Sequence, residues 1–275
     1  MHPARLLACV ALGLALMAPL GRGQDGCPAP DGALPSDPGC TGPFAVAWAG
    51  YDSRDEHPDG LVVEGIDFPV DVWGAVAYPE GFPQGAAPLL LVLHGNQSAN
   101  VCGGVFSRCD QHEGFFYLIE HLASQGFIAV SVNAERVNAP DFDRVPERAA
   151  LLLEHLRRWR AWSARGDGPL GEALVDHVDW RRVGLAGHSR GGEAVIAAHN
   201  ANLESAQPFE IGAVLSLAPT DKQALTILDV PHYAVVPACD GDVLDARGVR
   251  FCDRALRHDE ANPTPKRAIY PLGAN

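Results

Sequence analysis

The hydrophobic positions of this chain fall into two kinds of segment that alternate along the sequence. Runs that are apolar throughout are typical of strands buried on both faces, and they occupy residues 88–94, 127–132, 211–217 and 232–236, with a last strand beginning at 267–270. Segments with apolar residues on one side are typical of helices, and they occupy residues 114–125, 145–162 and 249–258. This alternation predicts an α/β fold with a mostly parallel sheet, right-handed crossovers and flanking helices.

The N-terminal part of the chain follows a different pattern. Residues 60–79 are expected to form two strands, placed at an antiparallel edge of the sheet. Residues 24–43 are rich in Gly, Pro and Asp, so 24–59 is expected to be an irregular arm. We therefore expect a single α/β domain over 60–275, with no internal repeat and no second domain.

Residues 1–23 have the parts of a secretory signal peptide. Arg5 supplies a basic start, Leu6–Met17 is an unbroken apolar run, and small residues lead to Gly23. The run is too short for a comfortable membrane span, so no stable membrane span is expected. A lipid anchor is a weaker alternative, because Cys9 lies at the start of the apolar run instead of its end. The prediction is a secreted or periplasmic protein.

Composition describes an ordinary globular chain with an acidic surface. Hydrophobic residues make up 47% of the sequence and charged residues 20%, with a formal net charge of -13. Such a surface repels nucleic acid and anionic membranes, so neither is expected as a partner. Arginine is frequent while lysine occurs only as Lys222 and Lys266, a usage that suggests a GC-rich bacterial genome.

The cysteines indicate disulfide bonds. Seven are present, and six remain if Cys9 leaves with the signal peptide. An even number in an exported chain favours disulfides, and proximity along the chain favours the pairs Cys27–Cys40, Cys102–Cys109 and Cys239–Cys252. A metal site is the weaker alternative, because no Cys-x-x-Cys spacing occurs.

The strongest chemical signal is Gly187-His188-Ser189-Arg190-Gly191, which follows a short apolar strand and precedes a helical run. This is the Gly-x-Ser-x-Gly nucleophile elbow in its strand–turn–helix context. The turn forces the serine into a strained backbone conformation, so only small neighbours fit at Gly187 and Gly191. It also places the serine oxygen near a helix N-terminus, where developing negative charge is tolerated. The weaker alternative is a glycine-rich turn that carries a surface serine.

These residues resemble the α/β-hydrolase superfamily, in particular its lidless branch of chlorophyllase-like, cutinase-like and dienelactone-hydrolase-like enzymes. A second match is the apolar strand Pro88–Leu93 followed by His94-Gly95-Asn96. The resemblance covers the chain from about Asp67 onward. The segment between the strands ending near Leu217 and starting near His232 is short, which suggests a site without a cap domain.

The resemblance implies the positions of the other catalytic groups. The backbone N–H groups of Asn96 and Arg190 correspond to the two oxyanion donors. The acid is expected just after a later strand, where Asp240 fits the family pattern best and Asp242 is the alternative. The aspartate that is not used is expected to cap the loop.

The catalytic histidine is the difficult assignment, because the family places it after the last strand. None of the histidines that follow Ser189 lies where the pattern requires the base; they are His199, His232 and His258. His94 and His188 are close to the site by position, but they are expected to shape the oxyanion loop and the elbow. We therefore expect the catalytic histidine and the last helix to lie beyond Asn275, where the sequence stops.

The implied function is an exported serine hydrolase that cleaves carboxylic esters through an acyl-enzyme on Ser189. Its substrate is a small-molecule or polymeric ester, and no metal or organic cofactor is implied. An acyltransferase of the same fold and a catalytically dead binding or scaffold protein remain alternatives. Trp73 and Tyr78 are candidates for lining a cleft, although packing is the more common role for aromatic residues in edge strands.

Overall fold

The structure is a computed structural model, and it describes residues 39–96, 110–138, 143–258 and 264–274. The predicted signal peptide at 1–23, the cysteines Cys27, Cys102 and Cys109, and the last residue, Asn275, lie outside the described residues. The predictions made for them therefore remain predictions, including the expectation that the catalytic histidine lies beyond Asn275.

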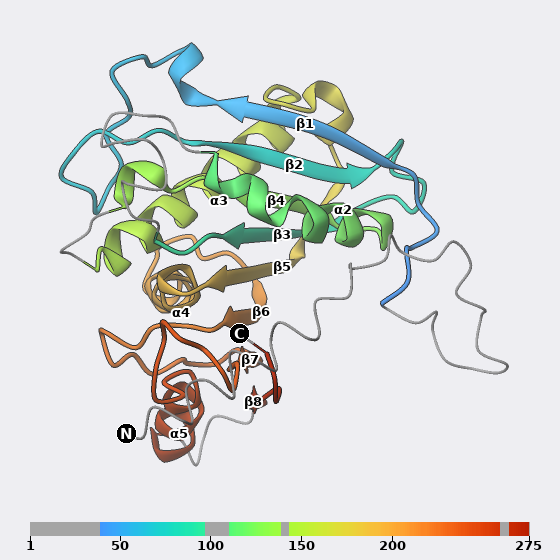
Figure 1. Cartoon of the computed structure of the whole chain (residues 1–275). Helices are drawn as coiled ribbons and strands as arrows, with labels where there is room; N and C mark the ends of the chain where they lie inside the picture. The colour runs from blue at the N-terminus through green and yellow to red at the C-terminus, as the bar shows by residue number, and fades with distance from the viewer. Residues whose placement is uncertain (1–38, 97–109, 139–142, 259–263, 275) are drawn as a thin grey trace, which may run out of the picture.

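An eight-stranded mixed sheet forms the centre of the molecule, in the order β1-β2-β4-β3-β5-β6-β7-β8 (Figure 1). The strands are β1 (Val46–Asp52), β2 (Trp73–Pro79), β3 (Ala87–Leu93), β4 (Ile128–Val132), β5 (Val178–His188), β6 (Ile211–Leu217), β7 (His232–Val235) and β8 (Lys266–Ile269). β2 is antiparallel to both β1 and β4, and every other neighbouring pair is parallel. This order is compatible with the α/β-hydrolase fold that the resemblance implies.

Helices cover the two faces of the sheet unequally. The helices are α2 (Phe116–Ser124), α3 (Val145–Arg165), α4 (Arg190–Leu203) and α5 (Val249–His258). Residues of α3, α4 and α5 belong to the large apolar cluster on one face, whereas α2 belongs to a smaller cluster on the other face. Short 3-10 turns lie at Ser53–Asp55, Gln111–Phe115, Glu135–Val137 and Gly171–Leu174.

The central strand β3 shows why the continuous apolar pattern predicts a buried strand. Leu89, Leu91 and Leu93 belong to the large cluster, and Val92 belongs to the small one, so β3 is covered on both faces. Each of these side chains is fully buried. Burial of one such side chain contributes about 1.5–3 kcal/mol, which makes β3 a principal source of stability.

The structure confirms most of the predicted elements and corrects the N-terminal part. The expectation of an irregular arm over 24–59 is wrong for 46–52, which form β1 and pair along their whole length with β2. The expectation of two strands within 60–79 is also wrong, because only β2 is a strand there. Leu61 and Val70 form an isolated bridge instead. The antiparallel edge exists, but β1 supplies its outer strand.

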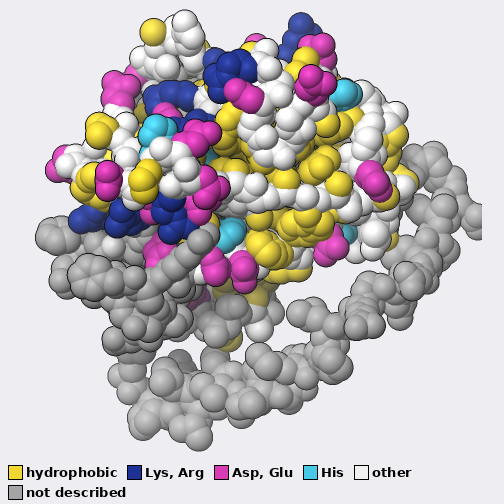
Figure 2. Space-filling view, turned by 90° about the horizontal axis from the view of Figure 1, so that it is seen from above, with side chains coloured by type: hydrophobic (Ala, Val, Ile, Leu, Met, Phe, Trp, Pro, Cys, Tyr) yellow, Lys and Arg dark blue, Asp and Glu magenta, His cyan; other side chains and the backbone are white. Residues whose placement is uncertain are grey.

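Apolar side chains on the β1 side of the molecule lie among charged ones, as Figure 2 shows. Trp48 on β1 is 40% exposed and packs on Phe116 of α2 with ring centroids 5.3 Å apart. Trp73 is buried against His112, and Tyr78 stacks on Phe82. Of the two aromatic residues considered for a cleft, Trp73 also lines a pocket of about 380 Å³ beside β1 and β2, whereas Tyr78 lines neither this pocket nor the larger one between α3 and α4.

One half of the α2 face has no helix over it within the described residues. On β6, β7 and β8 the side chains of Ala213, Tyr233 and Ile269 share that face by register and are all exposed. Tyr233 is 41% exposed and Ile269 is 48% exposed. β6 and β7 are therefore packed mainly on one side, and Arg267, Ala268 and Ile269 of β8 are all exposed.

The predicted disulfide between Cys239 and Cys252 is wrong. Both cysteines, which lie in the described part of the chain, are thiols. Cys252 is buried in α5, and burial raises the pKa of its thiol. Closeness in sequence does not by itself place two sulfur atoms at bonding distance. Cys40 is disulfide-bonded, and its pairing with Cys27 lies outside the described residues.

Buried histidines make the stability of this fold depend on pH. His155 on α3 is fully buried and its Nδ1 lies 2.7 Å from the Tyr51 hydroxyl. Burial, followed by the charge of Arg158, lowers the pKa of His155 to about 3. The unfolded chain therefore takes up this proton first as pH falls below about 6.5. Stability is complete above that pH and decreases toward pH 3.

We predict that the double variant Tyr51→Phe/His155→Leu reduces the acid sensitivity of the fold. Between pH 7 and pH 5 the parent should lose about 2 kcal/mol of unfolding free energy through this histidine, and the variant should not. Urea unfolding at several pH values measures the difference. His57→Gln, at an exposed site, is the control and should keep the parent pH dependence. Identical pH dependence in the double variant would contradict the prediction.

Candidate active site

Ser189 lies at the turn between β5 and α4 with a backbone conformation that serine rarely adopts. Its φ is 54° and its ψ is -122°. The residue as a whole is 7% exposed. The Ser189 N–H donates to the Leu217 carbonyl at 2.9 Å, and the Ser189 carbonyl accepts from the N–H groups of Glu193 and Thr220, both at 3.2 Å. These bonds fix a conformation that would otherwise cost about 1–3 kcal/mol.

The glycines beside Ser189 are required by close backbone contacts. A Cβ atom on Gly187 would lie 2.3 Å from the Gly191 carbonyl oxygen. A Cβ on Gly191 would lie 2.5 Å from the Leu93 oxygen, and one on Gly95 would lie 2.9 Å from the Ser189 Cβ. The turn therefore packs directly against the end of β3. The sequence-based reason for small residues at Gly187 and Gly191 agrees with these contacts.

The loop after β3 is held by a buried, neutral histidine. His94 Nδ1 donates to the Gly95 carbonyl at 2.6 Å, and His94 Nε2 accepts from the Ala134 N–H at 2.8 Å. Burial, with a smaller contribution from Arg148, lowers the pKa of His94 to about 3. With both ring nitrogens bonded to the backbone, His94 shapes the loop that carries Asn96.

The two candidate acids lie near the elbow. Asp240 is half-buried, and its Oδ1 accepts from the N–H groups of Asp242 and Val243, both at 2.9 Å. Asp242 is exposed. Partial burial lowers the pKa of His188, and the carboxylates of Asp240 and Asp242 oppose that shift. Both aspartates are thus close enough to His188, the residue before Ser189, to act on its charge.

Most other histidines of the described chain are engaged away from Ser189. His199 Nε2 lies 2.7 Å from the Leu228 carbonyl, and His232 Nε2 lies 3.1 Å from the Ser216 hydroxyl. His112 Nδ1 lies 3.0 Å from the Asn133 amide nitrogen. His258 is the last residue of α5. His188 is the described imidazole whose pKa the carboxylates of Asp240 and Asp242 raise against the effect of burial.

The end of the described chain runs close to the acid loop. The Ala238 N–H donates to the Pro271 carbonyl at 3.1 Å, and the Cys239 N–H donates to the Ala274 carbonyl at 3.0 Å. The segment that follows β8 therefore lies directly beside Asp240. Asn275 itself lies outside the described residues, so the expected histidine beyond Asn275 is not tested by these contacts.

Glu193 is a buried carboxylate that the sequence pattern did not indicate. It lies in the first turn of α4 and is fully buried. One oxygen accepts from the Thr220 hydroxyl at 2.7 Å, and the other accepts from the N–H groups of Lys222 and Gln223 at 2.8 Å and 2.6 Å. The carboxylate therefore ties the elbow helix to the loop after β6.

Arg148 is a second buried charge that the pattern did not indicate. It is fully buried on α3 and bonds to carbonyl oxygens of the loop after β3. A charged residue beside the run Ala149–Leu153 would be assigned to the solvent side of a helix by pattern alone. The only feature of the sequence that could have indicated burial of Arg148 was its position next to that leucine-rich run.

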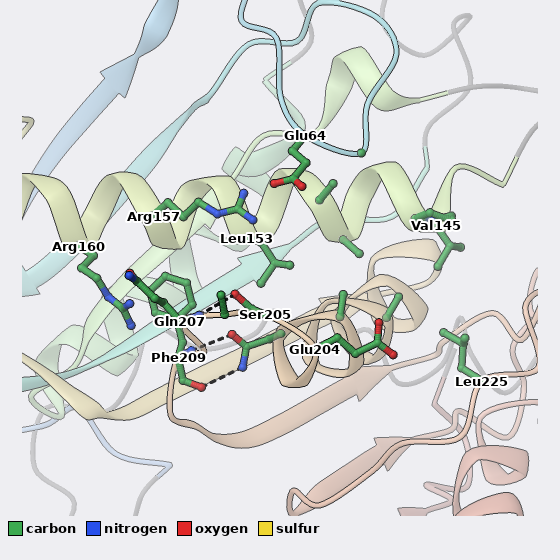
Figure 3. A pocket seen from close by; sticks show the side chains of 18 of the residues that line it. Glu64, Val145, Leu153, Arg157, Arg160, Glu204, Ser205, Gln207, Phe209 and Leu225 are labelled. Carbon is green, nitrogen blue, oxygen red and sulfur yellow. Dashed lines mark hydrogen bonds between the residues drawn. The ribbon is translucent and has the colours of Figure 1, made fainter.

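A cavity of about 1040 Å³ lies between α3 and α4, away from Ser189. Its wall includes Ala149, Leu153 and Phe209, and Figure 3 shows Arg157 and Arg160 extending from α3 along it. Arg160 lies over the Phe209 ring at 3.7 Å from the ring centroid. None of the residues around the elbow lines this cavity, so it is separate from the candidate active site.

The described residues hold neither a metal-binding cluster nor a membrane-spanning helix. No group of three or more His, Cys, Asp or Glu side chains within residues 39–96, 110–138, 143–258 and 264–274 has the arrangement of a metal site. Over the same residues, no helix has the length and apolar character needed to cross a membrane.

Comparison with known proteins finds no family model that matches this chain and no curated protein that matches it. A function for this protein is therefore inferred from its fold and from the geometry of the turn at Ser189.

We predict that Gly187→Ala and Gly191→Ala each destabilise the protein by about 3 kcal/mol or more, because each added methyl overlaps backbone oxygens that cannot move independently. Urea unfolding measures the loss. Gly114→Ala is the matched control, because a Cβ there meets nothing within 4 Å, and it should change stability by about 0.5 kcal/mol or less. Equal stability of all three variants would show that the turn is not tightly packed.

Proposed function

We propose that this protein is an α/β-hydrolase that cleaves carboxylic esters through an acyl-enzyme on Ser189. The observation that carries the proposal is the backbone of Ser189, with φ 54° at a strand-to-helix turn closed by Gly187 and Gly191. A non-glycine residue persists in such a conformation only where its surroundings impose it, and such residues cluster at active sites. The mostly parallel sheet of the structure supports the same class of protein.

The proposed reaction begins with attack of Ser189 Oγ on the ester carbonyl carbon. The carbonyl oxygen gains negative charge as the tetrahedral intermediate forms, and the N–H groups of Asn96 and Arg190 stabilise it. Expulsion of the alcohol leaves the acyl group on Ser189, and water then attacks this acyl-enzyme to release the acid. The acyltransferase alternative differs only in that an alcohol replaces water in the second step.

Asp240 or Asp242 is proposed to orient the imidazole that takes the Ser189 proton. Asp240 bonds two backbone N–H groups through Oδ1, which holds its carboxylate in one orientation. The exposed Asp242 has a less constrained position. Capping the loop is the role expected of the aspartate that is not used, whereas the family pattern favours Asp240, so Asp240 and Asp242 are both proposed as candidates for the acid.

None of the imidazoles that the structure describes is proposed as the base. The ring nitrogens of His94 are both bonded to backbone groups, and His199 and His232 bond to groups on other strands and loops. The carboxylates of Asp240 and Asp242 raise the pKa of His188 against the effect of burial, which makes His188 the internal alternative. We propose that His188 supports the cleft beside the acid loop and that it is not the base.

Export through residues 1–23 is part of the same proposal, because an ester hydrolase in the extracellular or periplasmic space would meet polymeric and small-molecule esters. A catalytically dead scaffold remains the alternative from a different functional class. The scaffold alternative differs from the proposed hydrolase in one measurable property, the reactivity of Ser189 as a nucleophile.

We predict that a fluorophosphonate probe labels wild-type protein and that Ser189→Ala abolishes the labelling. The reason is that the turn presents Ser189 Oγ to the oxyanion donors, which accelerate attack even without a base. Intact mass and peptide mapping identify the site. Ser163→Ala, which removes a hydroxyl bonded to the Arg160 carbonyl, is the matched control and should label as wild type does. Equal labelling of wild type and Ser189→Ala would favour the scaffold alternative.

We also predict that the 275-residue chain hydrolyses p-nitrophenyl esters slowly and that added imidazole accelerates the Ser189-dependent part of the rate. A missing base lowers turnover about as much as loss of the whole triad, because its members act as a unit. His188→Phe should leave this slow rate within about threefold, since the residual catalysis comes from the oxyanion donors. Rapid turnover that His188→Phe or His258→Gln abolishes would instead identify an internal base.

A further inference from the structure

Arg148 is a buried cation whose described bonding partners are all neutral. It is fully buried on α3. Its Nη1 donates to the His94 carbonyl at 3.0 Å, and its Nη2 donates to the Gly95 carbonyl at 3.5 Å and to Asn138 Oδ1. Its Nε is buried and has no partner in the described part of the chain. A buried charge without a carboxylate partner is costly, so its retention calls for an explanation.

The two carbonyls bound by Arg148 belong to the loop that follows β3. In a trans peptide the C=O and the N–H point in opposite directions. The Gly95 carbonyl points to the guanidinium and to His94 Nδ1, so the N–H of Asn96 in the same peptide plane points away from both. The His94 carbonyl fixes the Gly95 N–H in the same way. Arg148 therefore sets the direction of the loop's N–H groups.

The charge of Arg148 lies behind this loop in a region from which water is excluded. The ionised group that acts on the pKa of Arg148 is another cation, Arg190, the residue after Ser189. Among the described residues, the partners that Arg148 bonds are two carbonyls and an amide oxygen, and none is a carboxylate. An oxyanion that forms beside Ser189 would bring negative charge toward this guanidinium, so the attraction is stronger in the transition state than before reaction.

We propose that Arg148 is the positioning residue of the oxyanion hole, holding the His94-Gly95-Asn96 loop in its donor orientation and supplying positive charge behind it. This inference rests on the proposed function, because it assigns Arg148 a role in the reaction of Ser189. Arg148 does not touch the substrate, since its side chain is fully buried. It acts through the backbone of the loop.

The test compares Arg148→Met and Arg148→Lys with wild type. The readouts are the Ser189-dependent rate of p-nitrophenyl acetate hydrolysis, resolved into kcat and KM, and the rate of fluorophosphonate labelling. Arg148→Met should lower kcat and the labelling rate by about 10²-fold, the size expected for one lost oxyanion donor, with KM nearly unchanged. Arg148→Lys keeps the charge but not the two-pronged contact, so it should recover part of the loss.

Two controls separate this role from a general effect on folding. Arg158→Met removes an arginine of the same helix that pairs with Glu154 at 3.1 Å, and it should keep the wild-type kcat. Urea unfolding shows whether each variant is folded under assay conditions. Arg148→Lys provides the comparison if Arg148→Met does not fold. In a Ser189→Ala background, Arg148→Met or Arg148→Lys should cause no further loss of rate.

The outcomes distinguish the inference from the proposed function. Folded Arg148 variants with wild-type kcat and labelling rate would overturn the role of Arg148 and leave the role of Ser189 intact. Equal changes in kcat and KM, or an equal loss in Arg158→Met, would also overturn it. Wild type that reacts no faster than Ser189→Ala would overturn the proposed function and this inference together.

Discussion

The turn at Ser189 is the constraint on which the rest of the site depends. A serine at φ 54° is held there by one hydrogen bond from its N–H to Leu217 and by two bonds to its carbonyl. These partners come from β6, from the loop after it and from α4. The turn is therefore not a local property of Gly187–Gly191. It exists because the parallel strands β5 and β6 end side by side and because α4 begins directly after the turn.

Two buried charges keep the loops around this turn in place. Glu193 gathers three donors from the loop after β6, and Arg148 gathers three acceptors around the loop after β3. Each charge lies on a helix and bonds to a loop that lacks regular secondary structure. Hydrogen bonds to charged groups are worth about 1.5–3 kcal/mol each, so these contacts favour one loop conformation over alternatives of similar compactness.

The apolar pattern predicted much of the fold, and the reasons for its failures are physical. Strands such as β3 and β4 appear as continuous apolar runs and were predicted nearly to the residue, because the central part of the sheet is covered on both faces. β1 (VAWAGYD) was missed because it lies at the edge of the sheet, has no fully buried residue and is next to a Gly- and Pro-rich segment. Its pairing with β2 is a tertiary contact that no local pattern contains. The Cys239–Cys252 pair failed because sequence separation says little about the geometry that a disulfide requires.

The sequence predicted the backbone features of the candidate site. It did not predict the buried charged side chains that hold the surrounding loops. The Gly-x-Ser-x-Gly spacing and the position of His94-Gly95 are local signals, and both glycine requirements agree with contacts in the structure. Glu193 and Arg148 were not predicted, because periodicity treats charged residues in helices as solvent-facing. Only the three-dimensional arrangement shows that both point inward. The neutral state of His94 likewise follows from its backbone partners, one of which, Ala134, lies far away in the sequence.

The incomplete packing of the last strands has a consequence for the order in which the molecule opens. β3 is packed between apolar layers, whereas β7 and β8 have four residues each and an exposed face at Tyr233 and Ile269. Opening β8 exposes little additional apolar surface, so its amide hydrogens should exchange with solvent long before those of β3. β6 and β7 would then separate before the centre of the sheet. The acid loop follows β7 directly, so the two candidate acids, Asp240 and Asp242, belong to the part of the protein that opens earliest.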